Sequence, residues 1–212
     1  MLSTNTDILH KWTAFYQYFL AHGDQQTAQR LKQLIKKATK KEFIVTFCGH
    51  YSAGKSSMIN KLIGTQVLPT SPIPTTANII RVKKGRNQLK VSYRSNQGDV
   101  YTDVLDIKGV LQATERVEDI KELEVQLDTE LLLENTILMD TPGIDSTDQA
   151  HQLATESSIH LADIIFYVVD YNHVQSEINF DFTKQLVDSG KKFVLVVNQM
   201  DKHREAEISF QD

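Results

Sequence analysis

One stretch near residue 50 restricts the possible folds of this chain more than any other. Residues 43–48, Phe-Ile-Val-Thr-Phe-Cys, form a nearly continuous apolar run, which is typical of a buried parallel strand. The next eight residues, 49–56, read Gly-His-Tyr-Ser-Ala-Gly-Lys-Ser and fit the pattern G-x-x-x-x-G-K-[ST]. A helical pattern follows near 56–63. The sequence therefore predicts a strand, a glycine-rich loop and a helix N-terminus in direct succession.

Each residue type in this loop has a physical role in binding phosphate. Gly49 and Gly54 let the backbone turn tightly and approach an anion without an intervening Cβ atom. Exposed N–H groups and the helix N-terminus then form an anion cradle. We expect the Lys55 ammonium against the β- and γ-phosphates of a nucleotide, and the Ser56 hydroxyl on Mg²⁺. The residues expected to bind the nucleotide here are Gly49, His50, Tyr51, Ser52, Ala53, Gly54, Lys55, Ser56 and Ser57.

A second motif lies at 137–143. Its apolar run ends in Asp140 and is followed by Thr-Pro-Gly, a turn sequence that ends at Gly143. In P-loop nucleotide-binding proteins an aspartate at such a strand end holds Mg²⁺. We therefore predict that Asp140 binds magnesium through its water shell, and that the Gly143 N–H group faces the γ-phosphate.

The third motif is Asn198-Gln199-Met200-Asp201, again at the carboxyl end of an apolar run. It resembles the N-K-x-D guanine-recognition motif of GTPases, in which the aspartate accepts two N–H bonds from the guanine edge. Asn198 is expected to brace both the phosphate loop and the base. Gln199 replaces the usual lysine, so a shorter, uncharged stem covers the purine ring. As the third element in order, this motif favours GTP over ATP.

Apolar runs of the same character recur at 136–139, 164–169 and 193–197, with helical stretches near 148–160 and 175–188. This alternation predicts an α/β fold of the P-loop NTPase type. We expect a doubly wound, mostly parallel sheet that is flanked by helices and joined by right-handed crossovers.

The middle of the chain has a different pattern. Residues 78–84 and 89–94 are strand-like and flank Gly85-Arg86-Asn87, which predicts a hairpin between the two strands. Further on, apolar residues alternate with polar ones over 123–127 and predict another, half-exposed strand.

Residues 1–41 are predicted to form a helical segment, separate from a domain spanning 42–212. An apolar, aromatic stripe at helical spacing runs through residues 8–20. We expect this stripe to dock on a helical bundle or on the domain, and a helix lying on a membrane surface is the alternative.

Two helices are expected within this segment. Gly23 and Asp24 separate them as a predicted C-cap and N-cap. Four lysines lie near the end of the second helix, where cations complement the helix dipole. We expect them to be solvated, and a contact with acidic lipid or with a partner is the alternative. The lysines are Lys36, Lys37, Lys40 and Lys41.

Composition excludes several classes of protein. The chain has 212 residues, 41% hydrophobic and 24% charged, which excludes disordered, collagen-like and disulfide-rich proteins. A net charge of −4 provides no basic field, so no nucleic-acid partner is expected. The single cysteine, Cys48, is expected to be a buried packing residue in a reducing compartment. We find no signal peptide, no run long enough to span a membrane, and no pattern of a protein metal site beyond Mg²⁺ carried by a nucleotide.

Several features of the chain resemble the dynamin superfamily, and specifically its bacterial dynamin-like members. The loop at 50–57 is similar to the family's S-A-G-K-S-S phosphate loop. Residues 68–78, which begin Leu-Pro and contain two adjacent threonines, are similar to its first switch. The long spacing between Lys55 and Asp140 and the preceding helical stretch are similar to the arrangement around a dynamin-type G domain. The resemblance covers nearly the whole chain.

This resemblance implies a GTPase that pairs its G domains across the nucleotide face and uses the cycle for membrane fusion, fission or tethering. It places Thr76 on Mg²⁺, with its carbonyl orienting the attacking water; Thr75 is the less favoured neighbour. Ser52 would lie over the β–γ bridge and help to hold a monovalent cation, K⁺ or Na⁺, in the role of an arginine finger. The resemblance thus implies the catalytic residues Ser52, Lys55 and Thr76, and the metal-binding residues Ser56, Thr76 and Asp140.

The resemblance also carries expectations about rate and location. Tyr51 stands where dynamins often have glutamine, and Ile144 stands where Ras-type proteins carry their catalytic glutamine, so we expect slow hydrolysis that rises on dimerisation. The protein is expected to be cytoplasmic and peripheral at the inner face of the cell membrane, with lipid bound by regions outside this chain. We further expect the G domain to be truncated at its C-terminus.

Two other functional classes stay open from the sequence. A soluble GTPase of the ribosome-assembly type would act through RNA and would need a basic appendage that the charge balance does not provide. A nucleotide-gated scaffold with little or no turnover is the other class, and Gln199 and Tyr51 mildly favour it.

Overall fold

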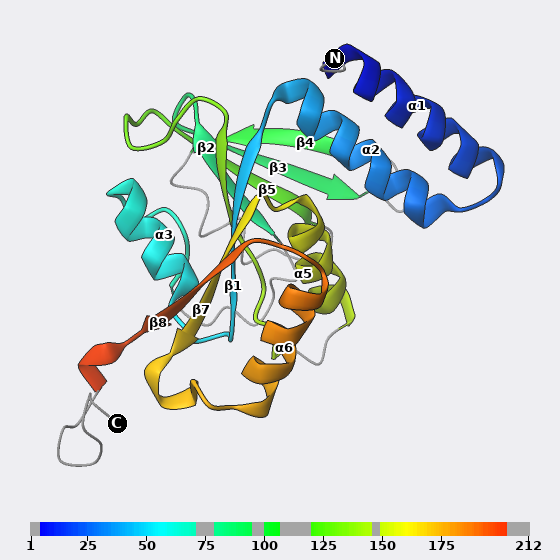
Figure 1. Ribbon diagram of the computed structural model, residues 1–212. Coiled ribbons are helices and arrows are strands. Elements are labelled where there is room, and N and C mark those ends of the chain that lie inside the picture. The colour runs from blue at the N-terminus through cyan, green and yellow to red at the C-terminus, as the bar shows by residue number, and fades with distance from the viewer. Residues whose placement is uncertain (1–4, 71–78, 95–99, 107–119, 146–148, 203–212) are drawn as a thin grey trace.

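The computed structural model provides the positions of most of the chain (Figure 1). The residues it describes are 5–70, 79–94, 100–106, 120–145 and 149–202. The part of the predicted first switch that holds Thr75 and Thr76 lies outside the described residues, so their predicted roles have no geometry to set against them.

The described part of the chain contains one eight-stranded sheet, with the strand order β4-β3-β5-β2-β6-β1-β7-β8. The strands are β1 (Phe43–Gly49), β2 (Ile80–Lys84), β3 (Gln88–Arg94), β4 (Val100–Leu105), β5 (Ile120–Leu127), β6 (Thr136–Asp140), β7 (Ile164–Asp170) and β8 (Phe193–Asn198). The strands β6, β1, β7 and β8 run parallel to one another, whereas β2 is antiparallel to β6. The predicted α/β fold with a mostly parallel sheet is therefore confirmed.

Helices cover both faces of the parallel half of the sheet (Figure 1). The longer helices are α1 (Asn5–Ala21), α2 (Gln25–Lys40), α3 (Lys55–Ile63), α5 (Gln149–Leu161) and α6 (Glu177–Asp188). Two short 3₁₀ helices are η2 (Tyr171–His173) and η3 (Met200–Lys202). No helix among the described residues is long and apolar enough to cross a membrane.

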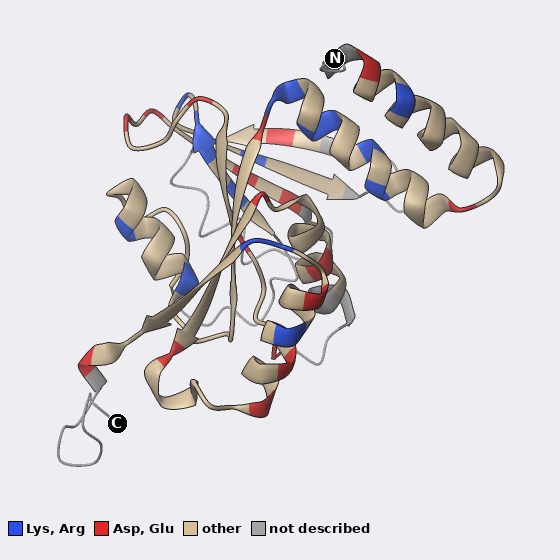
Figure 2. Cartoon of the chain, viewed as in Figure 1, with Lys and Arg blue, Asp and Glu red and all other residues tan. Residues whose placement is uncertain are grey.

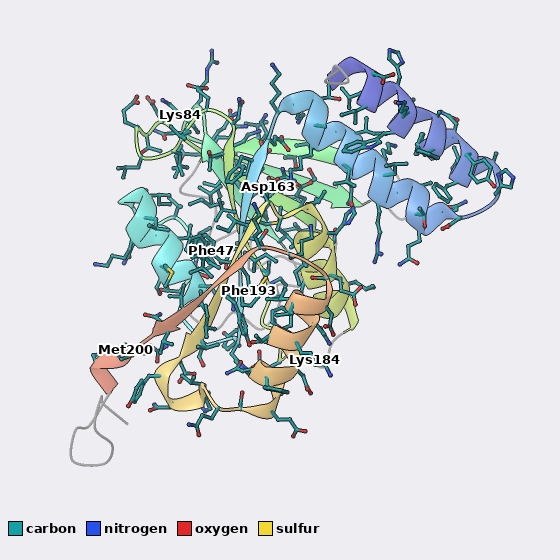
Figure 3. All side chains as sticks on the ribbon, viewed as in Figure 1. Phe47, Lys84, Asp163, Lys184, Phe193 and Met200 are labelled. Atoms are coloured by element: carbon teal, nitrogen blue, oxygen red, sulfur yellow. The ribbon has the colours of Figure 1, made fainter. Side chains whose placement is uncertain are left out.

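Strand β1 lies in the middle of this core, and its successive side chains face opposite layers. Phe47 belongs to the cluster on the α3 side and lies in the middle of the sheet (Figure 3). Its ring stacks on Phe166 at a centroid distance of 5.2 Å. Cys48 belongs to the cluster on the other side, with Tyr167 of β7 and Leu186 of α6. Burial on both faces explains the continuous apolar run that the sequence shows here.

The predicted hairpin across Gly85-Arg86-Asn87 is wrong. These residues connect β2 to β3, but the two strands do not pair, because β5 lies between them. Strand β5 is parallel to β2 and antiparallel to β3, and β3 pairs instead with β4. The apolar face of β5 is fully buried at Leu123 and Val125, so β5 is an interior strand and more buried than the predicted half-exposed strand.

The N-terminal helices form a pair, and the predicted caps are confirmed. Gly23 has a φ of +78°, and the Asp24 carboxylate accepts a hydrogen bond from the Thr27 N–H group at 3.0 Å. Helix α1 packs on α2, and α2 packs on α5. The apolar stripe of α1 is divided between partly buried residues such as Trp12 and exposed ones such as Phe15.

One of the four lysines of α2 is not solvated, which corrects the prediction. The Lys37 ammonium lies 2.7 Å from the Asp163 carboxylate and donates to the Leu161 carbonyl at 2.8 Å. The same Asp163 oxygen accepts the Ile44 N–H group at 2.7 Å. Figure 2 shows basic residues along α2 as far as the end that leads into β1. The last turns of α2 lie against the segment between α5 and β7, and this packing gives Lys37 partners that helix spacing alone does not indicate.

Candidate functional site

The loop between β1 and α3 has a backbone that requires glycine at two positions. Gly54 has a φ of +91°, and a Cβ atom there would collide with the Asn198 side-chain amide. Gly49 has a φ of +150°, and a Cβ atom there would collide with the Val168 carbonyl on the neighbouring strand. The loop therefore passes close to β7 and β8 with no room for side chains, while Tyr51 and Ser52 are exposed at its tip.

Lys55 begins α3, and its side chain is folded under the loop. Only 5% of the residue is exposed. Its ammonium donates to the carbonyl oxygens of Gly49 at 2.9 Å and His50 at 2.7 Å. Burial lowers the pKa of Lys55, because a charged ammonium loses water in this position. An anion in the loop would therefore gain a strong, desolvated partner.

Ser56 and Asp140 form the next part of the site. The Ser56 hydroxyl donates to Asp140 Oδ2 at 2.5 Å. In the described part of the chain, the other carboxylate oxygen, Oδ1, is buried and has no hydrogen-bond partner. Burial raises the pKa of Asp140, and the Lys55 charge offsets part of this rise. A hydroxyl beside an unpaired carboxylate oxygen is a donor set that Mg²⁺ accepts.

These two residues do not make a complete metal site. Within the described ranges, no group of three or more His, Cys, Asp or Glu side chains could hold a metal ion. A magnesium ion at Ser56 and Asp140 would therefore need further oxygen ligands from a nucleotide or from water.

The turn after β6 lies directly against the loop. The Ile144 N–H group donates to the Gly49 carbonyl at 3.2 Å. A Cβ atom on Gly143 would lie 2.8 Å from the Tyr51 nitrogen, so Gly143 allows this close approach. The Asp145 carboxylate accepts the Tyr51 N–H group at 3.0 Å. The sequence analysis missed Asp145, and its place shortly after Asp140 was the only available indication.

A second group of residues lies behind the loop and joins the predicted His50 to Asn179 and Tyr167, which the sequence analysis missed. His50 Nε2 is 2.6 Å from the side-chain oxygen of Asn179 in α6, and His50 Nδ1 is 3.6 Å from Asp145. Asn179 is 3% exposed and also accepts the Tyr167 hydroxyl at 2.5 Å. Nothing in the sequence of α6 distinguishes Asn179 from an ordinary polar helix residue.

The third predicted motif lies at the other end of the loop. The Asn198 amide donates to the Ala53 carbonyl at 2.8 Å, and the Gln199 amide donates to the Ser52 carbonyl at 2.7 Å. Gln199 adopts a left-handed φ of +61°. Asp201 is exposed in η3, next to Met200 at the end of β8 (Figure 3). The structure thus brings the loop, Ser56, Asp140, Gly143 and Asn198 to one edge of the sheet.

A match to a known protein family decides where this arrangement belongs. Residues 45–201 match the model described as the dynamin family, and this range includes all three motifs. The chain belongs to the dynamin family. Its dynamin G domain combines the phosphate loop, the strand that ends in Asp140, and the Asn198 motif within one sheet.

Relatives of known name agree with this dynamin assignment. The chain is 38% identical over 206 residues to Dynamin-like protein A of Bacillus subtilis, covering 97% of this chain and 17% of that protein. It is 26% identical over 183 residues to the tRNA modification GTPase MnmE of Mycoplasmoides gallisepticum, covering 82% of this chain and 31% of that protein. The chain therefore spans well under half of either relative. The second of these relatives is named as a GTPase.

Solved structures support the dynamin fold. One structure of an oligomerised bacterial dynamin pair, described as a mechanism for long-range sensing and tethering of membranes, has a TM-score of 0.63. It is 18% identical in sequence and covers 98% of this chain and 41% of that one. At this identity the match shows a shared fold.

Proposed function

We propose that this dynamin-family chain binds GTP with Mg²⁺ and hydrolyses it to GDP and phosphate. Two neighbouring features carry the proposal. Lys55 is buried under a glycine-rich loop, and in the part of the chain that the structure describes Asp140 Oδ1, beside Ser56, is buried without a hydrogen-bond partner. Ser56 satisfies only one of the two Asp140 carboxylate oxygens. A magnesium ion bound to a nucleoside triphosphate would supply a partner for the other oxygen and an anion for Lys55. Ser56 and Asp140 would hold the ion, which when bound neutralises charge on the β- and γ-phosphates.

The chain's own residues would position the nucleotide from both ends. The loop amides and Lys55 would bind the phosphates, and the Gly143 N–H group would face the γ-phosphate. Asn198 already fixes the loop through Ala53, and the exposed Asp201 would approach a guanine edge from the end of β8. The Gln199 side chain would lie near the purine ring, where lysine is usual. By family resemblance, Ser52 with a K⁺ or Na⁺ ion and Thr76 would serve the hydrolysis step.

The proposal extends to the whole protein. We place a dynamin-type G domain at 42–212 and a helical-bundle segment at 1–41, and we propose that GTP drives pairing of G domains across the nucleotide face. The exposed Tyr51 and Ser52 lie on that face. The oligomerised bacterial dynamin pair, whose structure is described as a mechanism for membrane tethering, supports coupling of this pairing to membrane remodelling at the inner face of the cell membrane. The partners are then a second copy and lipid, without nucleic acid.

Phosphate release by the full chain tests this function. Turnover should rise with protein concentration, because pairing would complete the site, and it should rise further with liposomes. The Lys55→Ala variant is the control for contaminating activity. A rate per molecule that is independent of concentration would contradict the pairing. Stimulation by ribosomes in place of liposomes would favour an RNA-associated GTPase, the function suggested by the tRNA modification relative. Nucleotide binding without release would favour a scaffold.

A further inference from the structure

The carboxylate of Asp145 occupies the phosphate loop in this structure. One oxygen accepts the Tyr51 N–H group at 3.0 Å. A Cβ atom on Gly143 would lie 2.5 Å from that same oxygen and 2.8 Å from the Tyr51 nitrogen, so three groups converge on one point. A carboxylate here takes up a loop amide that would otherwise be available to an anionic ligand.

This point lies at the end of the site that would receive the third phosphate. The predicted base-binding residues contact the loop at Ala53 and Ser52, through Asn198 and Gln199. Asp145 contacts the loop on the side of the Asp140 turn, where Gly143 is proposed to meet the γ-phosphate. A nucleotide that is held at the base end would therefore extend its terminal phosphate toward Asp145.

We infer that Asp145 is a specificity-determining residue, which disfavours a nucleoside triphosphate relative to a diphosphate by holding its carboxylate in the place of the third phosphate. This inference rests on the proposed function. A diphosphate leaves the contact between Asp145 and Tyr51 intact. A triphosphate must displace the carboxylate, because two anions cannot share one N–H donor at hydrogen-bond distance without strong repulsion.

The buried Asn179 fixes the imidazole of His50 behind the loop, next to Asp145. The Asn179 amide nitrogen donates to the His173 carbonyl at 2.5 Å, which leaves its oxygen as an acceptor for the Tyr167 hydroxyl and for His50. His50 must therefore donate from Nε2. Its other nitrogen, Nδ1, then faces Asp145 at 3.6 Å. At 3.6 Å this nitrogen is beyond hydrogen-bond distance, so the Asp145 carboxylate depends on its contact with the Tyr51 N–H group.

Paired dissociation constants for GDP and a non-hydrolysable GTP analogue, with Mg²⁺ present, test the inference in the full chain. We expect Asp145→Ala to bind the GTP analogue about tenfold more tightly, since a charge-assisted hydrogen bond no longer has to be broken, while GDP affinity changes less than about twofold. Asp145→Asn should shift the ratio less, because its amide oxygen can still accept from Tyr51.

The matched control is Asp188→Asn, which removes the same charge from the exposed C-terminal end of α6 and should leave both affinities unchanged. Equal shifts for GDP and the GTP analogue, or no shift, would overturn the inference while leaving the proposed function intact. Failure of the unaltered chain to bind either nucleotide would instead overturn the proposed function, and this inference with it.

Discussion

The two ends of the proposed nucleotide site differ in how the fold supports them. At the phosphate end, Lys55 and Asp140 are 5% and 7% exposed and are fixed by the core around β1 and β6. At the base end, β8 is the edge strand of the described sheet, and Asp201 is exposed beyond it. Three apolar side chains of β8 are open to solvent, namely Val194, Leu195 and Val197. Core packing therefore fixes the phosphate end, whereas the base end depends on two amide contacts to the loop.

The largest expected effect comes from removing the buried cation at the phosphate end. Lys55→Ala should weaken binding of GTP at least about a hundredfold and abolish turnover, because the loop loses its desolvated charge. Calorimetry and phosphate release measure the two effects. Lys61→Ala, which removes an exposed lysine from the same helix, is the control and should behave as the unaltered chain. Retained binding in Lys55→Ala would show that core burial does not determine affinity at this end.

The next largest effect should come from altering Asp140, which with Ser56 is proposed to hold Mg²⁺. Asp140→Asn should reduce turnover by about tenfold to a hundredfold, and chelation of Mg²⁺ by EDTA should do the same to the unaltered chain. If EDTA lowers the turnover of Asp140→Asn as much as that of the unaltered chain, Asp140 does not hold the ion.

Asp140→Asn, which should lower turnover, should raise the stability of the chain when no nucleotide is bound. Because burial raises the pKa of Asp140, its folded form binds a proton more tightly than the unfolded form, so the free energy of unfolding falls as pH rises from 3.8 through the raised pKa. Asparagine does not ionise, so the free energy of unfolding of Asp140→Asn does not fall in this way. The variant should therefore have a higher midpoint of thermal unfolding at neutral pH than the unaltered chain. A lower midpoint for the variant would contradict this account.

A smaller effect is expected at the base end. Asp201→Asn should weaken GTP binding by about tenfold and leave ATP binding unchanged, because one charge-assisted contact to guanine is lost. Competition binding with both nucleotides measures the selectivity, and Asp188→Asn is the charge-matched control. An equal loss for GTP and ATP would place Asp201 outside the base site.

Restoring the usual lysine should give a modest gain at the same end. Gln199→Lys should tighten GTP binding by about threefold, since a longer, charged stem covers the purine ring. The contact to the Ser52 carbonyl can be kept by the ammonium. Weaker binding would show that the amide contact to the loop matters more than cover over the base.

The smallest expected effect concerns Cys48, whose thiol should not react with alkylating reagents in the folded chain. Burial raises the pKa of the Cys48 thiol to about 12, so the thiolate that attacks alkylating reagents is scarce at neutral pH. Iodoacetamide, followed by mass spectrometry, should label the unfolded chain and leave the folded chain unlabelled. Rapid labelling of the folded chain would show that the strand before the loop opens more readily than its burial indicates.

Sequence reasoning succeeded where a feature is local. The apolar run at 43–48, the glycines of the loop and the Asp24 cap depend on neighbouring residues, and the structure has each of these features. It failed where a distant segment decides the outcome. No turn pattern indicates that β5 enters between β2 and β3, and no helix spacing indicates that Lys37 meets Asp163.

The candidate site follows the same rule. The three motifs could be found because each lies at the end of its own strand, and parallel strands bring their carboxyl ends to one edge. The contacts of Asp145 and His50 could not be found in this way. The His50 contact depends on Asn179, which approaches from α6 and also accepts the Tyr167 hydroxyl of β7. The Asp145 contact depends on the close approach of the Asp140 turn to Tyr51.

The shared oxygen of Asp163 has a mechanical consequence. It joins the Lys37 ammonium of α2 to the Ile44 amide, which is near the start of the strand that ends at the phosphate loop. A displacement of the α1–α2 pair would therefore act on the start of β1 through this shared oxygen as well as through the short link before the strand.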